Sequence, residues 1–141
     1  MITEKELENY NNLWQKISNR ATEILEIYRK VRDEVFGTAF SAYAYTGIST
    51  ELRSADFVTF SGVDSQDIIY TGEEFWSYGG HESHTLALPL NYLTCENLDD
   101  VLRKEFSKEK EELERQEELK IKLKEMEERA LFDKLAEKYG N

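Results

Sequence analysis

The feature that most constrains the fold of this chain is its C-terminal stretch, residues 97–139, which contains no glycine or proline and is dominated by Glu and Lys. Glu and Lys are strong helix formers, and opposite charges four residues apart stabilise the helix that carries them. Asn97 is a suitable N-cap, and Asp99 and Asp100 fall in the first turn, where negative charge is favoured. The stretch therefore predicts a single helix of roughly 60 Å.

Apolar residues are sparse along this predicted helix, and their register slips after Leu113. The later ones are Leu119, Leu123, Met126, Ala130, Leu131, Phe132, Leu135 and Tyr139. A helix this polar is either a solvated arm or one strand of an oligomeric coiled coil. An apolar tip exposed on its own would be a liability, so we expect a homo-oligomer assembled through the helices. A monomer with this helix folded against the N-terminal helix is the alternative.

Residues 1–36 carry an uninterrupted heptad pattern. Thr3 and Glu6 form a capping box at its start, and Gly37 is well placed to end the helix. Apolar residues recur between them at alternating steps of three and four: Leu7, Tyr10, Trp14, Ile17, Ala21, Ile24, Tyr28, Val31 and Val35. This spacing predicts a long amphipathic helix. We expect it to pack on a sheet, on the C-terminal helix or on a second copy.

Helical periodicity stops at Gly37, and residues 37–96 have the composition of a small sheet. Residues 38–48 are compatible with a strand or with a continued helix. Aromatic and β-branched residues bounded by turn residues then predict three strands, at 56–62, 67–76 and 84–90. The short connections between these strands favour an antiparallel meander.

Two glycine and proline positions refine the predicted sheet. Gly72 interrupts the second strand and is a candidate β-bulge, and Pro89 marks an edge or the end of the third strand. Strand alternation places one set of side chains on the core face: His84, Leu86, Leu88 and Leu90. It places Thr85, Ala87 and Pro89 on the opposite face.

Together these patterns predict an α+β fold: a long N-terminal helix, a small antiparallel β-meander and a long charged, coiled-coil-like C-terminal helix. Residues 1–96 are expected to form a helix-plus-sheet domain, and residues 97–141 a charged helical arm that oligomerises. The single cysteine, Cys95, excludes an internal disulfide. No segment is apolar enough to cross a membrane, and the N-terminus lacks the order of a signal peptide. These features favour a cytoplasmic protein.

Charge is unevenly distributed and excludes one class of partner. The net charge is -11, and residues 37–96 carry eight Asp and Glu against Arg53 as the only cation. A nucleic-acid surface requires clustered Lys and Arg, so direct DNA or RNA binding through this segment is not expected. An acidic surface suits a basic protein partner or a divalent cation, or serves only solubility.

The rarest side chains gather between residues 75 and 93. Trp76, Tyr78, His81, Glu82 and His84 are predicted to form a binding surface for a protein or a ligand, because amphipathic aromatics displayed by a rigid sheet are common recognition elements. The alternative is that the two large aromatics only cover the open end of the sheet.

The same segment offers imidazole and carboxylate groups, the ligands that divalent transition metals take. Glu82 and His84 share one side of an extended chain, whereas His81 does not, and Glu73 and Glu74 lie across the predicted hairpin. The spacing matches no zinc-enzyme motif, and no nucleophile elbow or phosphate loop is present. We therefore predict no catalytic residues, no metal and no cofactor. A metal-dependent enzyme is the alternative.

A second candidate site would use cations from the helices. Arg29, Lys30 and Arg32 would bind an anion if Arg53 or Arg103 lay close to them in the fold. The simpler interpretation is that the first three complement the dipole at the C-terminal end of their helix.

The segment W-S-Y-G-G-H-E-S-H-T-L-A-L-P-L-N-Y-L, residues 76–93, is followed by the Glu/Lys-rich helix and resembles small accessory proteins of tailed bacteriophages and prophages. The resemblance implies a phage protein acting in the host cytoplasm, where small acidic oligomers bind or block host factors. It brings no site residues with it. The predicted function is a non-enzymatic interaction protein that modulates a host protein or defence system. The alternative is an oligomeric binder that sequesters an anionic nucleotide signal.

Overall fold

The computed structural model describes residues 1–37 and 50–140, and it confirms the predicted α+β fold. Its elements follow in the order α1 (Glu4–Phe36), α2 (Thr50–Ser54), β1 (Thr59–Val63), β2 (Asp67–Phe75), β3 (His81–Pro89), η2 (Leu90–Thr94) and α3 (Leu98–Tyr139). The prediction for residues 38–48 lies outside the described residues. Within the described ranges, no helix is both long and apolar enough to span a bilayer.

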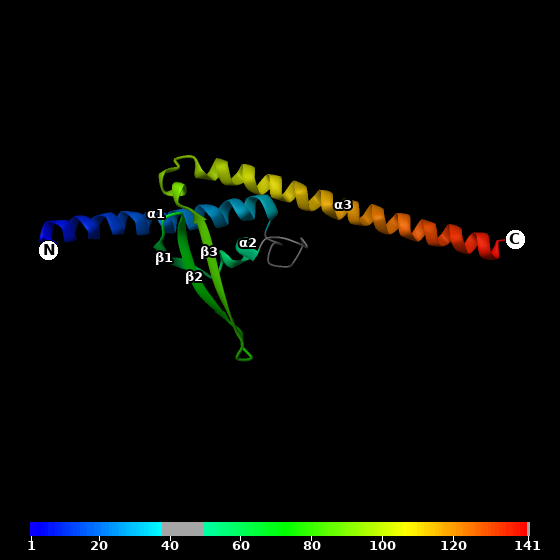
Figure 1. The fold of residues 1–141 in the computed structure, drawn as a ribbon, viewed down its shortest axis with the longest axis horizontal. Helices are drawn as coiled ribbons and strands as arrows, with labels where there is room; N and C mark the ends of the chain where they lie inside the picture. The colour runs from blue at the N-terminus through cyan, green and yellow to red at the C-terminus, as the bar shows by residue number, and fades with distance from the viewer. Residues whose placement is uncertain (38–49, 141) are drawn as a thin grey trace.

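The helices α1 and α3 lie side by side and run in the same direction, so that their free ends project to opposite ends of the molecule (Figure 1). Arg20 donates to the backbone carbonyl of Cys95, just before α3, at 2.5 Å. Farther along both helices, Arg103 pairs with Glu34 at 3.0 Å. The sheet lies on one side of this helix pair, and the β2–β3 hairpin projects away from it (Figure 1).

The helix α1 begins and ends where the sequence predicts. The backbone N–H of Glu6 donates to Oγ1 of Thr3 at 3.1 Å, and Gly37 takes a left-handed φ of 78° while its N–H donates to the carbonyl of Asp33. The predicted heptad seam is buried only from Ala21 to the end of the helix. The first turns of α1 are exposed, including Leu7, Tyr10, Leu13 and Trp14.

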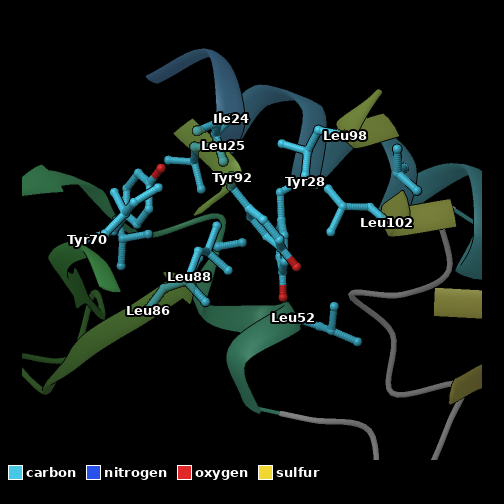
Figure 2. Packing of buried hydrophobic residues seen from close by; sticks show 14 of the residues in the cluster. Ile24, Leu25, Tyr28, Leu52, Tyr70, Leu86, Leu88, Tyr92, Leu98 and Leu102 are labelled. Carbon is cyan, nitrogen blue, oxygen red and sulfur yellow. The ribbon is translucent and has the colours of Figure 1, made fainter. Parts of the chain in front are cut away.

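One core joins α1, the sheet and the beginning of α3, as Figure 2 shows. The ring of Tyr28 from α1 meets the ring of Phe106 from α3 edge to face, with centroids 5.1 Å apart. The hydroxyl of Tyr70 donates to the backbone carbonyl of Ala21 at 2.6 Å, which ties β2 to α1. Burial raises the pKa of Tyr28 and Tyr70 above the ordinary tyrosine range. Burial and the neighbouring Glu105 raise the pKa of Tyr92 to about 12.

The first turns of α3 complete this core, Leu113 packs against its edge, and α3 is exposed beyond Leu113. Leu98, Leu102 and Phe106 are buried, and every residue of the range 114–139 is exposed. We call residues 114–139 the arm. Asn97 occupies the predicted N-cap position, but its side chain makes no capping hydrogen bond to α3.

The sheet is the predicted antiparallel meander, with strand order β1-β2-β3. The starts of two strands differ from the prediction by three residues. β1 starts at Thr59 because the N–H groups of Asp56 and Phe57 bond back to the carbonyls of α2 and so close a turn. β3 starts at His81, because the N–H of Trp76 donates to the carbonyl of Gly80 and closes a short hairpin loop.

The prediction that Gly72 forms a bulge is wrong. Gly72 pairs in register with His84, and the register shift lies in β1, between Phe60 and Gly62. A Cβ atom on Gly72 would lie 1.8 Å from the backbone oxygen of Phe57. Glycine is therefore needed because the chain entering β1 crosses directly over β2.

Alternation along β3 follows the prediction. His84, Leu86 and Leu88 are buried, whereas Thr85 and Ala87 are exposed. The strand ends at Pro89, and Leu90 begins η2 rather than continuing the core face.

Candidate functional site

Two pairs of stacked aromatic rings stand at the end of the β2–β3 hairpin. Trp76 stacks on Tyr78 with centroids 5.8 Å apart, and Phe75 stacks on His81 at 5.7 Å. We call these four residues the hairpin tip. Phe75 and Tyr78 are 72% and 81% exposed. Gly80 keeps the Trp76 ring against the loop, since a Cβ on Gly80 would lie 2.6 Å from a carbon of that ring. The hairpin tip is thus a preformed aromatic surface.

The five residues predicted to form one binding surface divide between two places. Trp76, Tyr78 and His81 belong to the hairpin tip. Glu82 and His84 lie farther down the hairpin, on the face of β3 that turns toward the core. Phe75 was missing from the predicted surface, although alternation along β2 places it on the exposed face.

His84 is held on three sides. Its Nδ1 lies 2.9 Å from Oγ of Ser54 in α2, and its Nε2 lies 3.2 Å from Oε1 of Glu74 in β2. The ring of Phe57 stacks on the imidazole with centroids 4.7 Å apart. His84 is only 8% exposed. The imidazole is therefore fixed in position and orientation by its neighbours.

Glu74, Glu82 and His84 form a compact group of metal-ligand side chains. The register places Glu74 directly opposite Glu82, and His84 follows Glu82 by two residues on the same face of β3. One ligand atom from each of the three side chains lies within 4.8 Å of the other two. His81, on the opposite face of the strand, is not part of the group.

Ser54 and Phe57 could not be identified from the sequence as neighbours of His84. They precede it by about thirty residues and belong to no motif, and α2 itself was not predicted. Ser54, His84 and Glu74 are connected in the order of a hydrolytic triad. The Ser54 side chain is buried, however, so its hydroxyl serves to orient the imidazole rather than to meet a substrate.

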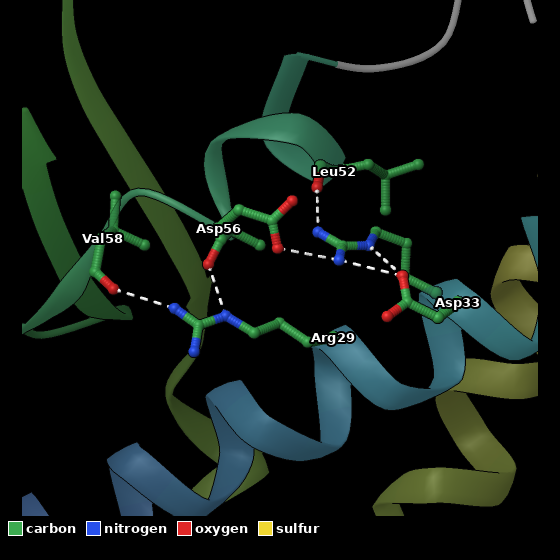
Figure 3. Close-up of polar contacts among 7 residues, drawn as sticks. Arg29, Asp33, Leu52, Asp56 and Val58 are labelled. Carbon is green, nitrogen blue, oxygen red and sulfur yellow. Dashed lines mark hydrogen bonds and ion pairs between the residues drawn. The ribbon is translucent and has the colours of Figure 1, made fainter. Parts of the chain in front are cut away.

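The cations of the predicted anion site are engaged elsewhere. Arg29 donates through Nε to the carbonyl of Ala55 at 2.7 Å and through a terminal nitrogen to the carbonyl of Val58 at 3.2 Å (Figure 3). Arg32 donates to the carbonyl of Leu52 at 2.9 Å. These carbonyls lie in and after α2, where a helix end leaves acceptors without partners in the helix.

Two cations of the predicted anion site, Arg32 and Arg103, pair with carboxylates. Arg32 also pairs with Asp33 and Asp56, at 2.9 Å and 2.8 Å (Figure 3). Arg103 pairs with Glu34 and Asp100 on the surface, Lys30 is exposed on α1, and Arg53 lies in α2. Arg29 and Arg32 therefore connect α1 to the segment that leads into β1, whereas Arg103 pairs with carboxylates on the surface, so these three arginines do not form one anion site.

Comparison with known proteins finds no matching family model, no matching curated protein and no matching solved structure. The resemblance to phage accessory proteins stays a prediction.

Proposed function

We propose that the protein is a non-enzymatic interaction protein that forms an antiparallel homodimer through the arm and presents the hairpin tip to a second protein. The observation that carries this proposal is the arm. Every residue of the range 114–139 is exposed, yet the arm displays an apolar seam that is complementary to itself. In proteins, most of the stability of a helix comes from packing its apolar face against a partner rather than from helix propensity alone.

The seam consists of Leu119, Leu123, Met126 and Ala130, at steps of four, three and four residues. Such steps keep side chains on one face of a helix and define a coiled-coil seam. The order of the steps is the same in both directions. In an antiparallel pair, Leu119 therefore faces Ala130 of the second copy, and Leu123 faces Met126. Two-fold symmetry forms each contact twice.

Charge favours the antiparallel arrangement. The two-fold axis would pass between Lys124 and Glu125, with a lysine-rich segment, residues 120–124, before it and a glutamate-rich segment, residues 125–128, after it. An antiparallel pair lays the two segments across from each other, so that Lys120 of each copy lies beside Glu127 of the other, while Lys122 lies beside Arg129. A parallel pair in register places Lys122 beside Glu127 of the second copy, but it also places Arg115 beside Lys120 and Arg129 beside Lys134. Charges flanking a seam commonly set the orientation of coiled coils.

Two neighbouring residues provide a matched test of the seam. Leu123 and Ile121 are 51% and 52% exposed, but they lie about 200° apart around the helix, so that only Leu123 is in the seam. We expect the wild type and Ile121→Glu to sediment with twice the 16.6 kDa mass of one chain, and Leu123→Glu to sediment as a monomer. A wild-type protein that stays monomeric at high micromolar concentration, or equal behaviour of the two variants, would refute the dimer.

The hairpin tip is the proposed surface for the second protein. Exposed Trp, Tyr and Phe rings are the side chains that most often anchor protein interfaces. The nearby carboxylates of Glu73, Glu74 and Glu82 make the surroundings acidic. This combination suits arginine and lysine side chains, which stack on aromatic faces and pair with carboxylates. In the phage setting implied by the resemblance, the second protein would be a host factor.

An arginine-rich peptide is a direct probe of the hairpin tip. We expect calorimetric titration to show that the wild type binds this peptide. The double variant Phe75→Ala/Tyr78→Ala should bind it at least tenfold more weakly. Tyr10→Ala, which removes an exposed aromatic from α1, should leave binding unchanged. Equal affinity for the hairpin-tip variant and the wild type would contradict this assignment.

The alternative functions find less support. A nucleotide binder needs converging cations, and Arg29 and Arg32 are bound instead to backbone carbonyls and carboxylates. An enzyme needs a reactive group that a substrate can reach, and the serine beside His84 is buried.

A further inference from the structure

We propose that Glu74, Glu82 and His84 bind one divalent transition-metal ion on the core-side face of the β2–β3 hairpin, with zinc as the best-suited ion. The proposal does not depend on the dimer or on the partner of the hairpin tip. It concerns three side chains whose ligand atoms already lie within 4.8 Å of one another, two of which, Glu74 and His84, are in direct contact.

The spacing of the ligand atoms is close to that of a metal site. Zinc lies about 2.0–2.2 Å from imidazole nitrogen and carboxylate oxygen, so that ligand atoms on one ion are about 3.4 Å apart in tetrahedral geometry. The ligand atoms of the three side chains lie within 4.8 Å of one another, and Nε2 of His84 is already 3.2 Å from Oε1 of Glu74. Rotation of the exposed Glu82 side chain would bring its carboxylate oxygen to the spacing that a bound ion requires.

The imidazole of His84 is oriented by a hydrogen bond in the way that metal-binding histidines usually are. Such a histidine donates its second ring N–H to a neighbouring acceptor, which fixes the tautomer and the ring orientation. Here Nδ1 of His84 lies 2.9 Å from Oγ of Ser54, and Phe57 stacks on the ring. A serine hydroxyl can donate or accept, so the same contact serves the ring with and without an ion. With Nδ1–H donating to Ser54, the lone pair of Nε2 points toward the carboxylates.

Charge and donor type favour the same class of ion. Two carboxylates and a neutral imidazole carry two negative charges, which a divalent cation balances in a partly buried place. One nitrogen and two oxygen donors suit zinc and its neighbours in the first transition row, whereas copper(I) prefers sulfur. Three protein ligands leave one tetrahedral position for water.

The bound ion would link the hairpin to the core. It joins β2 to β3 directly behind the hairpin tip, because Glu74 and Glu82 adjoin Phe75 and His81, and Ser54 and Phe57 connect His84 to α2 and the chain after it. An ion at this point would tie the two strands behind the hairpin tip to His84 and so fix the direction in which the hairpin tip is presented.

The chain supplies matched controls on the same two strands. His81 is the only other histidine, and Glu73 is the carboxylate next to Glu74, on the opposite face of β2. Isothermal titration with ZnCl2 should give one ion per chain for the wild type, for His81→Gln and for Glu73→Gln. Affinity should fall more than about 100-fold for His84→Gln, and about tenfold or more for Ser54→Ala through loss of the orienting contact. Cobalt(II) should give visible absorption bands that His84→Gln removes.

Glu82→Gln keeps the test decisive if His84→Gln fails to fold, because the Glu82 side chain is exposed and its exchange leaves the core intact. The proposal is overturned if the wild type binds no stoichiometric zinc, or if Glu82→Gln binds zinc as tightly as Glu73→Gln. Leu123→Glu should still bind one ion per chain, so failure of the dimer and failure of the metal site are distinguishable.

Discussion

Replacing Gly72 by alanine should destabilise the protein strongly, because the chain entering β1 leaves no room for a side chain there. The added Cβ would lie 1.8 Å from the backbone oxygen of Phe57, 2.8 Å from its carbonyl carbon and 3.0 Å from Cα of Val58. These are backbone atoms, so no rotamer change relieves the overlap. Overpacking of cores typically costs about 1–3 kcal/mol. We expect Gly72→Ala to lie at the upper end, at about 3 kcal/mol.

Gly62 in β1 is the matched control. A Cβ at this position meets nothing within 4 Å, so Gly62→Ala should change the free energy of unfolding by no more than about 0.5 kcal/mol. Thermal unfolding followed by circular dichroism should place the midpoint of Gly72→Ala roughly 10 °C below that of the wild type, and the midpoint of Gly62→Ala close to it. If Gly72→Ala has the same unfolding midpoint as the wild type, the chain does not cross β2 as described.

Two further predictions concern the core. Arg32→Ala leaves the carbonyl of Leu52 without its buried donor and should lower the free energy of unfolding by about 2–3 kcal/mol in urea titration, whereas Lys30→Ala on the exposed face should change it by less than about 0.5 kcal/mol. The raised pKa of Tyr92 predicts alkaline destabilisation: the unfolded chain releases this proton at about pH 10 and the folded chain only near pH 12, so stability is complete below pH 10 and falls as pH rises through that interval. Urea midpoints between pH 9 and pH 12 should fall less steeply for Tyr92→Phe, and equal slopes would show that another group governs the loss.

Local features of the fold could be predicted because local contacts cause them. Thr3 and Gly37 bound α1 through hydrogen bonds to residues within one turn, and the alternation of His84, Leu86 and Leu88 follows from strand geometry alone. The same reasoning indicated that Glu82 and His84 share a face and that His81 does not. Each of these inferences requires only a few neighbouring residues.

Contacts between distant segments could not be predicted. Ser54 and Phe57 reach His84 only because Gly72 lets the chain cross over β2, and glycine in a strand indicates a bulge equally well. Arg29 and Arg32 looked available for an anion because the short helix α2, whose end supplies their acceptors, has no sequence signal of its own. Side-chain chemistry identified the residue types correctly, but not their partners.

The central claim is that two arms pair in antiparallel orientation, and a distance between the two copies tests it most directly. Lys138 lies near the end of the arm, about 90° around the helix from the seam. Spin labels at Lys138→Cys, in a chain that also carries Cys95→Ser, should be roughly 40 Å apart if the axis passes between Lys124 and Glu125, since each residue adds about 1.5 Å along both helices. Pulsed electron resonance should detect this distance. A distance near the roughly 10 Å separation of parallel helix axes, or no distance between copies at all, would contradict the account.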